Sequence, residues 1–141
     1  MTKGRLQDRI AVITGGASGI GEATARLFVG EGCRVVIGDV QEERGLAVAR
    51  DIGNQARFLP CNVTRPEEVE RLVAAAVDWA GRLDIMFNNA GIVGAKGPVE
   101  DIPVAEWKAT IDVLLNGVFY GMKYSAAVMK RQGHGSIVSM T

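Results

Sequence analysis

Apolar runs and amphipathic stretches alternate along this chain. Most of the apolar runs lack polar alternation, as strands buried on both faces of a parallel sheet do, and they predict strands at residues 10–13, 34–39, 56–63, 83–87 and 135–140. Between them, apolar residues recur at helical spacing and predict helices at residues 18–31, 41–52, 65–80 and 104–131. This order predicts right-handed βαβ units and therefore the α/β class, with a doubly wound parallel sheet (a Rossmann fold) of strand order 3-2-1-4-5.

Local signals refine three of these elements. Pro60 is tolerated in a sheet only near an edge or a strand end, which agrees with an outer third strand. Thr64 followed by Glu67 predicts a capping box at the start of the third helix, and Gly81 ends that helix. The apolar stripe of the last helix is wider than one buried face. This helix therefore needs two neighbours: the sheet, and either a second subunit or another helix of the same chain.

The turn after the first strand is rich in glycine. Gly15, Gly16, Gly19 and Gly21 fall within seven positions, directly before a predicted helix. Glycine lets a ligand approach backbone N–H groups closely, and the start of a helix attracts anions, so this turn predicts a pyrophosphate site. Its spacing differs from the dinucleotide fingerprint Gly-x-Gly-x-x-Gly, and an ordinary strand-to-helix turn is the alternative.

Asp39 ends the second predicted strand, eighteen residues after Gly21. In a dinucleotide-binding fold, an acid at this place accepts hydrogen bonds from the adenosine ribose of NAD, and its charge repels the 2′-phosphate of NADP. No basic residue stands at Ala17, Ser18 or Val40 to offset that charge, which favours NAD as the cofactor. The alternative is a solvated acid at a strand end.

Two amides and two small residues follow the fourth predicted strand, as Asn88, Asn89, Ala90 and Gly91. The amides can fix neighbouring strands, and the small residues leave room for a flat ligand close to the backbone. An Asn-Gly turn with no further role is the alternative. The combination of this segment with the glycine turn and Asp39 favours a ligand site.

Composition indicates a soluble protein of one domain with small-molecule partners. Its 141 residues are 48% hydrophobic and 23% charged, and 16 basic residues balance 16 acidic ones. A net charge of zero gives no sign of nucleic-acid or membrane binding. Cys33 and Cys61 lack metal-ligand spacing and are expected in or near the core of a reduced, cytoplasmic protein.

Together these segments resemble the cofactor half of the classical short-chain dehydrogenase/reductase family. The resemblance rests on residues 14–21, Asp39, 62–63 and 88–91, and it covers essentially the whole chain. It implies that the glycine turn lines the pyrophosphate and ribose. Residues at the ends of the second and third strands would contact the adenosine, and residues after the fourth strand would contact the nicotinamide-side ribose. The residues implied to bind NAD are Gly15, Ser18, Gly19, Ile20, Asp39, Val40, Asn62, Val63, Asn89, Ala90 and Gly91.

The sequence departs from the family pattern at several places. Asn62 stands where the family often has Asp, although an amide can still both donate to and accept from the adenine edge. Leu114 replaces the supporting Asn of the family's Val-Asn-Leu-x-Gly pattern. Asn116 is only a weak catalytic candidate, because residues two apart on a helix do not share a face. Thr141 matches the first residue of the family's Ser-Ser pair, so the catalytic Ser would lie just beyond it.

The Tyr-x-x-x-Lys motif of the family is absent, since neither Tyr120 nor Tyr124 has a Lys four residues later. His134, between two glycines, is expected in a loop rather than as a base. The complete enzyme that the resemblance implies would use Tyr as general acid/base and Ser to hold the substrate oxygen. It would pass hydride between the nicotinamide and a secondary alcohol or ketone. We therefore expect residues 1–141 to form an NAD-binding Rossmann domain that is incomplete at its C-terminal end and inactive alone.

The fifth predicted strand has no following helix to cover it, so it would be an unprotected edge. We therefore expect the chain to be part of a longer polypeptide. The family's paired helices imply a homodimer or homotetramer. Two other functions stay open: a non-catalytic dinucleotide-binding protein with this fold, and an S-adenosylmethionine-dependent methyltransferase, which the Asn-Asn-Ala-Gly segment disfavours.

Overall fold

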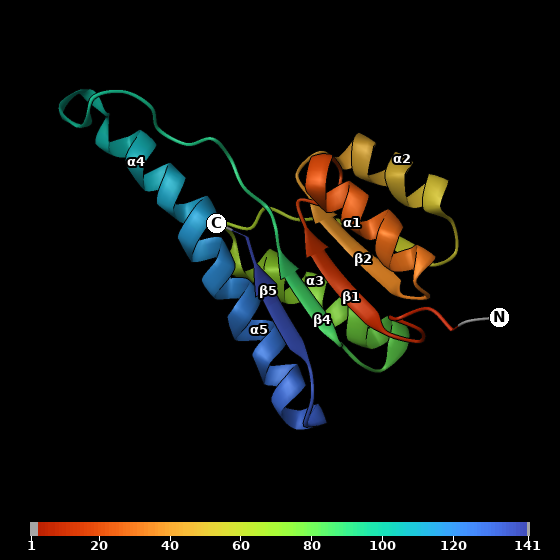
Figure 1. The fold of residues 1–141 in the computed structure, drawn as a ribbon. Helices are drawn as coiled ribbons and strands as arrows, with labels where there is room; N and C mark the ends of the chain where they lie inside the picture. Colours follow the sequence, from red (N-terminus) through yellow and green to blue (C-terminus); the bar gives the residue numbers. More distant parts are fainter. Residues whose placement is uncertain (1–2, 141) are drawn as a thin grey trace.

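The computed structural model describes residues 3–140 and contains a five-stranded parallel sheet with its connecting helices (Figure 1). The strands are β1 (Ile10–Thr14), β2 (Arg34–Asp39), β3 (Ala56–Pro60), β4 (Ile85–Asn88) and β5 (Ser136–Ser139). The helices are α1 (Gly19–Gly30), α2 (Glu42–Ile52), α3 (Pro66–Ala80), α4 (Val104–Ile111) and α5 (Gly117–Gln132), with a 3₁₀ turn, η1 (Val99–Asp101), and a π-helical turn, η2 (Asp112–Asn116). The strand order β3-β2-β1-β4-β5 confirms the predicted doubly wound sheet.

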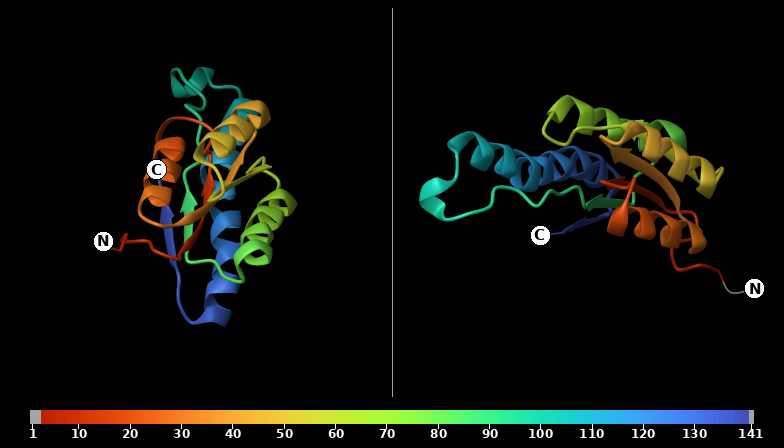
Figure 2. Two further views of the ribbon diagram at one scale, coloured as in Figure 1. Left: turned by 90° about the vertical axis from the view of Figure 1, so that its right-hand side faces the viewer. Right: turned by 90° about the horizontal axis from the view of Figure 1, so that it is seen from above.

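Helices cover both faces of the sheet (Figure 2). On one face, residues of β1, β2 and β4 pack against α3 and α5, around Leu72 and Met129. On the opposite face, the sheet packs against α1 and α2, around Ala25 and Val48. Every residue of β1 is buried, which explains why this strand is one continuous apolar run in the sequence.

β3 forms one edge of the sheet, as Pro60 predicts. Within residues 3–140 it pairs only with β2, in a register that runs from Val35 opposite Ala56 to Asp39 opposite Pro60. The strand ends at Pro60 and is therefore shorter than the predicted 56–63. After it, the Cys61 N–H donates to the carbonyl oxygen of Asp39 (3.0 Å), and the chain leaves the sheet.

The predicted capping box at the start of α3 is wrong. α3 begins at Pro66, and no side chain caps its first turn. The Thr64 hydroxyl instead donates to Oδ1 of Asn62 (2.8 Å). The carboxylate of Glu68, rather than that of Glu67, accepts from the Asn62 N–H (2.7 Å). The prediction failed because Pro at the first helical position moves the start of the helix beyond Thr64.

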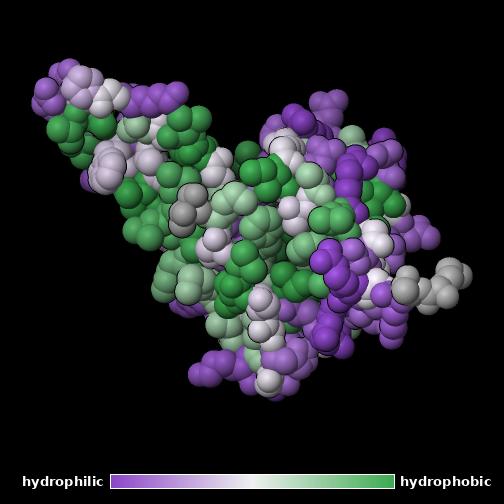
Figure 3. All heavy atoms as spheres, in the orientation of Figure 1, coloured by the Kyte–Doolittle hydropathy of each residue, from purple (hydrophilic) through white to green (hydrophobic). Residues whose placement is uncertain are grey.

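The helix predicted over residues 104–131 is continuous but not regular. The π-helical turn η2 separates α4 from α5, and such a turn inserts an extra residue into the helical hydrogen-bond pattern. α4 projects beyond the sheet with hydrophobic side chains along it (Figure 3), and the Ala95 N–H donates to the Thr110 hydroxyl to attach the preceding loop (2.9 Å). Within residues 3–140, no helix combines the length and the apolar character that a membrane span requires.

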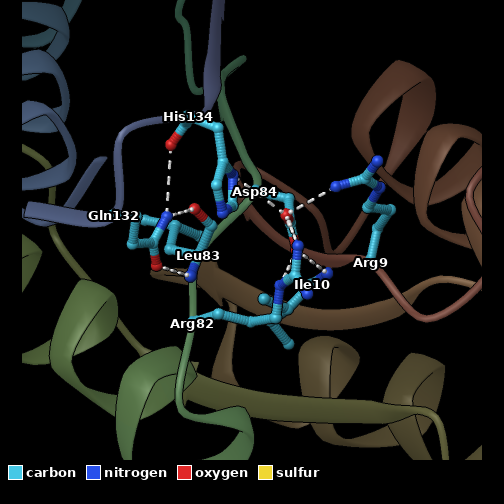
Figure 4. Close-up of polar contacts among 7 residues, drawn as sticks. All are labelled: Arg9, Ile10, Arg82, Leu83, Asp84, Gln132 and His134. Atoms are coloured by element: carbon cyan, nitrogen blue, oxygen red, sulfur yellow. Dashed lines mark hydrogen bonds and ion pairs between the residues drawn. The ribbon is translucent and has the colours of Figure 1, made fainter. Parts of the chain in front are cut away.

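A buried carboxylate connects the amino ends of the central strands (Figure 4). Asp84, which is 4% exposed, accepts hydrogen bonds from the Ile10 N–H (2.9 Å) and from the guanidinium groups of Arg9 and Arg82. His134 lies in the loop before β5, as predicted, and its Nδ1 is 3.6 Å from the same carboxylate. Burial would raise the pKa of Asp84, but these hydrogen bonds outweigh burial and hold the pKa below its usual value.

Candidate functional site

A cavity of about 900 Å³ opens along the carboxyl ends of the strands. Residues that follow β1, β2, β3 and β4 line it, together with Val113 and Leu114 of η2 and Met140 after β5. The order of the strands reverses between β1 and β4, and doubly wound folds bind their ligands in the crevice at such a point. The size of the cavity suits an organic cofactor.

The glycine turn forms the part of the cavity wall between β1 and α1. Gly15 and Gly19 have positive φ angles of 67° and 53°, which other residues rarely adopt. A Cβ on Gly21 would collide with the carbonyl oxygen of Gly15, so only glycine allows α1 to start this close to the turn. The N–H groups of Gly19 and Ile20 donate to no group within residues 3–140. These free donors and the positive end of the helix dipole make an anion site.

Asp39 lies at the end of β2, and two backbone groups fix its carboxylate. It is 6% exposed and accepts from the N–H groups of Ala17 and Gln41 (3.0 Å each), with a longer contact from the Gln41 side chain (3.4 Å). The bond to Ala17 ties β2 to the glycine turn. An ionised carboxylate accepts about four hydrogen bonds, so Asp39 keeps capacity for a ligand hydroxyl in the cavity that it lines.

Thr14 and Asn89 hold the segment after β4 against the glycine turn. Oγ1 of Thr14 accepts from the N–H groups of Asn89 (3.0 Å) and Ala90 (3.1 Å). In return, Nδ2 of Asn89 donates to the carbonyl oxygens of Thr14 (3.0 Å) and Gly15 (3.2 Å). The two sequence motifs therefore form one connected structure, and Thr14, which was not among the predicted site residues, positions both.

Asn62 and Val63 line the cavity beyond the end of β3. Oδ1 of Asn62 accepts from both the N–H (3.0 Å) and the hydroxyl (2.8 Å) of Thr64. A carbonyl oxygen has two lone pairs, and both are used here. In this orientation the amino group of Asn62 is free to donate to a ligand, whereas its oxygen is already bonded to Thr64.

Every residue predicted to bind NAD lines this one cavity. The prediction did not include seven further lining residues: Gln41, Cys61, Ile92, Val93, Val113, Leu114 and Met140. Most of these lie beside a predicted residue just past a strand end, so the sequence contained a signal for them. Leu114 of η2 had a signal as well, because it aligns with the supporting Asn of the family pattern, whereas Val113 could be placed at the cavity only once the fold was known.

Leu114 and Asn116, the two residues compared with the family's supporting Asn, separate in the structure. Leu114 lines the cavity, and its side chain lies 3.5 Å from the place that a Cβ on Gly91 would take. Asn116 lies outside the cavity and donates from its amide to Oδ1 of Asp112 (2.8 Å). The weak catalytic candidate therefore does not line the cavity, even though the helix is locally distorted there. Thr141 lies outside the described residues.

The cavity offers binding groups rather than acid/base groups. Among its lining residues, which all fall between 15 and 140, the titratable side chains are those of Asp39 and Cys61. Burial raises the pKa of the Cys61 thiol to about 12, so this thiol stays protonated at neutral pH. Cys33 is buried in the core as a free thiol as well, as predicted.

Residues 9–141 match the family model described as short chain dehydrogenase. The chain is 47% identical over 136 residues to a mitochondrial borneol dehydrogenase of Lavandula x intermedia and 40% identical over 138 residues to a 3-alpha-(or 20-beta)-hydroxysteroid dehydrogenase of Mycobacterium bovis. Among solved structures, it is similar to levodione reductase (TM-score 0.90, 34% identity) and to a short chain dehydrogenase/reductase from Burkholderia phymatum in complex with NAD (TM-score 0.91, 29% identity).

These similarities cover nearly all of this chain but only half of each relative. The two sequence matches include 96% and 98% of the chain, and 52% and 53% of the dehydrogenases. The two structural matches include 96% and 99% of the chain, and 54% and 50% of the solved chains. The chain therefore spans about half the length of the relatives that it matches.

Proposed function

The chain belongs to the short-chain dehydrogenase family, and we propose that it binds NAD in the cavity as the cofactor half of an oxidoreductase. In the complete enzyme, the bound nicotinamide would exchange a hydride with the carbon of a secondary alcohol or ketone. Residues 1–141 would supply the NAD-binding Rossmann domain. The acid/base residues would come from outside this segment.

The proposal rests on the convergence of four segments on one cavity. Residues 15, 18–20, 39–40, 62–63 and 89–91 belong to four separate segments of the sequence, and all of them line it. The free N–H groups at the start of α1 and the unused acceptor capacity of Asp39 are the two polar features that a dinucleotide needs: one takes phosphate and the other takes ribose hydroxyls.

Each segment would hold a different part of the dinucleotide. Gly19 and Ile20 would donate to the pyrophosphate, and Asp39 would accept from the adenosine ribose. Residues 62–63 would meet the base, and residues 89–91 would lie at the nicotinamide-side ribose. Because backbone hydrogen bonds fix Asp39 and the segment after β4, these groups need no rearrangement to bind, which lowers the entropic cost of binding.

A non-catalytic dinucleotide-binding protein is the second candidate. It is favoured by Leu114, an apolar residue at the cavity where the family pattern has Asn. Family membership removes the methyltransferase alternative. The two remaining candidates both require NAD binding and differ only in whether the complete protein turns over substrate.

Calorimetric titration of the full chain with NAD tests the proposal. We expect saturable binding, and we expect Ile20→Glu to weaken it. Ile20 is exposed at the start of α1, so the new carboxylate suits the helix dipole but repels the pyrophosphate. Two unit charges at 4 Å repel by about 4 kcal/mol at an effective dielectric of 20, and a third of that after screening is roughly a tenfold loss of affinity.

Leu27→Glu is the matched control, because Leu27 is equally exposed on the same helix but does not line the cavity. It should leave NAD affinity unchanged. The same samples, mixed with NAD and a panel of secondary alcohols, should form no NADH. Absence of NAD binding would refute the proposed function, and turnover comparable to that of a family enzyme would refute the expectation that the chain alone is inactive.

A further inference from the structure

The cavity is polar at one end and apolar at the other. The Asp39 carboxylate and the Asn62 amide lie at the end formed by β2 and β3. At the end formed by β4, β5 and η2, the lining residues from position 90 to position 140 have no hydroxyl, amide or charged side-chain group. They are Ala90, Gly91, Ile92, Val93, Val113, Leu114 and Met140. Four of these side chains, those of Ile92, Val93, Leu114 and Met140, are between 41% and 77% exposed, so a ligand can cover them.

The segment that carries Val93 is anchored to α4. Gly94 has a positive φ of 77°, and a Cβ there would lie 2.6 Å from Cγ2 of Thr110. The following N–H, that of Ala95, donates to the Thr110 hydroxyl (2.9 Å), which itself donates to the Glu106 carbonyl oxygen (2.8 Å). The chain thus turns just after Val93 and is tied to a helix. This part of the cavity wall is therefore formed before a ligand binds.

Leu114 contributes to the apolar end from a different element. It belongs to η2, and its Cδ2 lies 3.5 Å from the place that a Cβ on Gly91 would take. The family pattern has Asn at this position, so Leu114 replaces an amide with hydrocarbon. A ligand at this end therefore meets apolar side chains from the segment after β4 and from η2.

On the proposed function, the substrate occupies this end of the cavity. Residues 89–91 would lie at the nicotinamide-side ribose, and the carbon that exchanges the hydride must lie beside the nicotinamide. The rest of the substrate would then contact Val93 and Leu114. A hydroxyl group placed there would lose its hydration without gaining a partner, whereas a CH₂ group would be stabilised by burial.

We propose that the substrate is a ketone or secondary alcohol carried on a hydrocarbon skeleton, such as an alicyclic ring, rather than a sugar or another polyol. This inference rests on the proposed function, because it needs the nicotinamide beside residues 89–91. Val93 and Leu114 are the residues that select the skeleton.

The test compares two ketones of the same shape on the full chain saturated with NAD. One is cyclohexanone, and the other is tetrahydropyran-4-one, in which an ether oxygen replaces a ring CH₂ group. Because NAD and the ketones are all in the oxidised form, no hydride is transferred and only binding is measured. NMR titration of the methyl groups should show that cyclohexanone binds about tenfold more tightly, since the ether oxygen loses its hydration. The methyl signals of Val93 and Leu114 should shift as the ketone saturates the chain.

Val93→Thr exchanges a methyl group for a hydroxyl at nearly constant size. Because Val93 is 77% exposed, the substitution does not disturb folding. It should reduce the ratio of the two dissociation constants about threefold. Val99→Thr is the matched control, since Val99 follows the same strand and is exposed but does not line the cavity. It should leave the ratio unchanged.

The titration with NAD separates the failure of this inference from the failure of the proposed function. A chain that binds NAD overturns only this inference if it binds neither ketone, or binds both with affinities within about threefold of each other. An unchanged ratio in Val93→Thr, or saturation without shifts of the Val93 and Leu114 methyl signals, overturns it as well. A chain that does not bind NAD refutes the proposed function and this inference with it.

Discussion

A single carboxylate, that of Asp39, joins the glycine turn to the ligand-facing edge of β2. Its bond to the Ala17 N–H holds the turn, and its bond to the Gln41 N–H holds the start of the loop after β2. Both bonds use backbone donors that need an acceptor but not a negative charge. The charge itself is therefore available to select the ligand.

We expect Asp39→Asn to weaken the discrimination between NAD and NADP. The amide oxygen still accepts a backbone bond, but the repulsion of the 2′-phosphate disappears. That repulsion, reduced by solvent to about a third of 4 kcal/mol, corresponds to roughly a tenfold change in the ratio of the two dissociation constants. Titration of the variant with each cofactor measures it.

Val40→Ala provides the comparison for this substitution, because Val40 lines the same part of the cavity without a charge. Its ratio of NAD to NADP affinity should equal that of the wild-type chain. If the ratio in Asp39→Asn also stays at the wild-type value, the carboxylate does not select between the cofactors, and the preference for NAD has another source.

At the residue scale, position relative to a strand end was predictable and side-chain orientation was not. Asp39 ends one apolar run and Asn89 comes just after another. Both could be located, because parallel strands bring residues at their carboxyl ends to one edge of the sheet. The orientation of Asn62 depends on Thr64, whose hydroxyl the sequence assigned to a helix cap. A side chain with two possible partners cannot be assigned from spacing alone.

At the scale of elements, the break in the last helix had no signature in the sequence. A π turn shifts the apolar stripe that follows it around the helix, and in the sequence such a shift cannot be told from one helix with a wide stripe, so the pattern over 104–131 predicts one helix. The structure places η2 against the cavity, where Leu114 and Val113 form part of the wall. The element was predictable, and the local change in its winding was not.

At the end of the sheet opposite the cavity, Asp84 holds the amino ends of the strands together. Besides its side-chain bonds to Ile10, Arg9 and Arg82, its backbone N–H donates to the Ile10 carbonyl oxygen (2.9 Å), and its carbonyl oxygen accepts from the Ser136 N–H (2.8 Å). One residue thus connects the amino ends of β1, β4 and β5. This region is remote from the cavity, so its contribution is to stability rather than to binding.

We expect Asp84→Ala to lower the free energy of unfolding at neutral pH by about 3 kcal/mol, because it removes a buried carboxylate and leaves the Ile10 N–H without its acceptor. The pKa of Asp84 is lowered by folding, so its contribution is complete above the unfolded value of about 3.8 and disappears as the pH falls through the lower folded value. Urea unfolding at several pH values measures this.

Glu22→Gln is the control for Asp84→Ala, because Glu22 pairs with Arg26 on the outer side of α1, where both side chains keep contact with solvent. An exposed pair of this kind contributes only about 0.5 kcal/mol. The difference between wild type and Asp84→Ala should shrink in acid, whereas that for Glu22→Gln should be small at every pH. An Asp84→Ala difference that stays constant from neutral pH into acid would contradict the assigned role of the carboxylate.

At the scale of the whole molecule, the topology could be predicted from the order of the elements, because strand–helix–strand crossovers are right-handed. The order of the elements did not tell which partner covers the apolar side chains that stay exposed. Trp107, Leu115, Phe119 and Met122 are all exposed along α4, η2 and α5. α4 projects beyond the sheet, whereas α5 runs alongside β5 (Figures 1 and 3). An apolar face of this extent is typical of an interface, and a net charge of zero gives no long-range repulsion between copies.

We therefore expect this face to pair with the same face of a second copy, which gives a homodimer; the predicted homotetramer would need a second interface between dimers. Phe119→Glu should shift the chain toward monomer, because a carboxylate at the centre of an apolar interface loses its hydration without gaining a partner. Leu46→Glu, at an exposed position on α2, should not. Sedimentation velocity over a range of concentrations distinguishes the two. A wild-type chain that is monomeric throughout, or a Phe119→Glu chain that associates as wild type does, would mean that another partner covers this face.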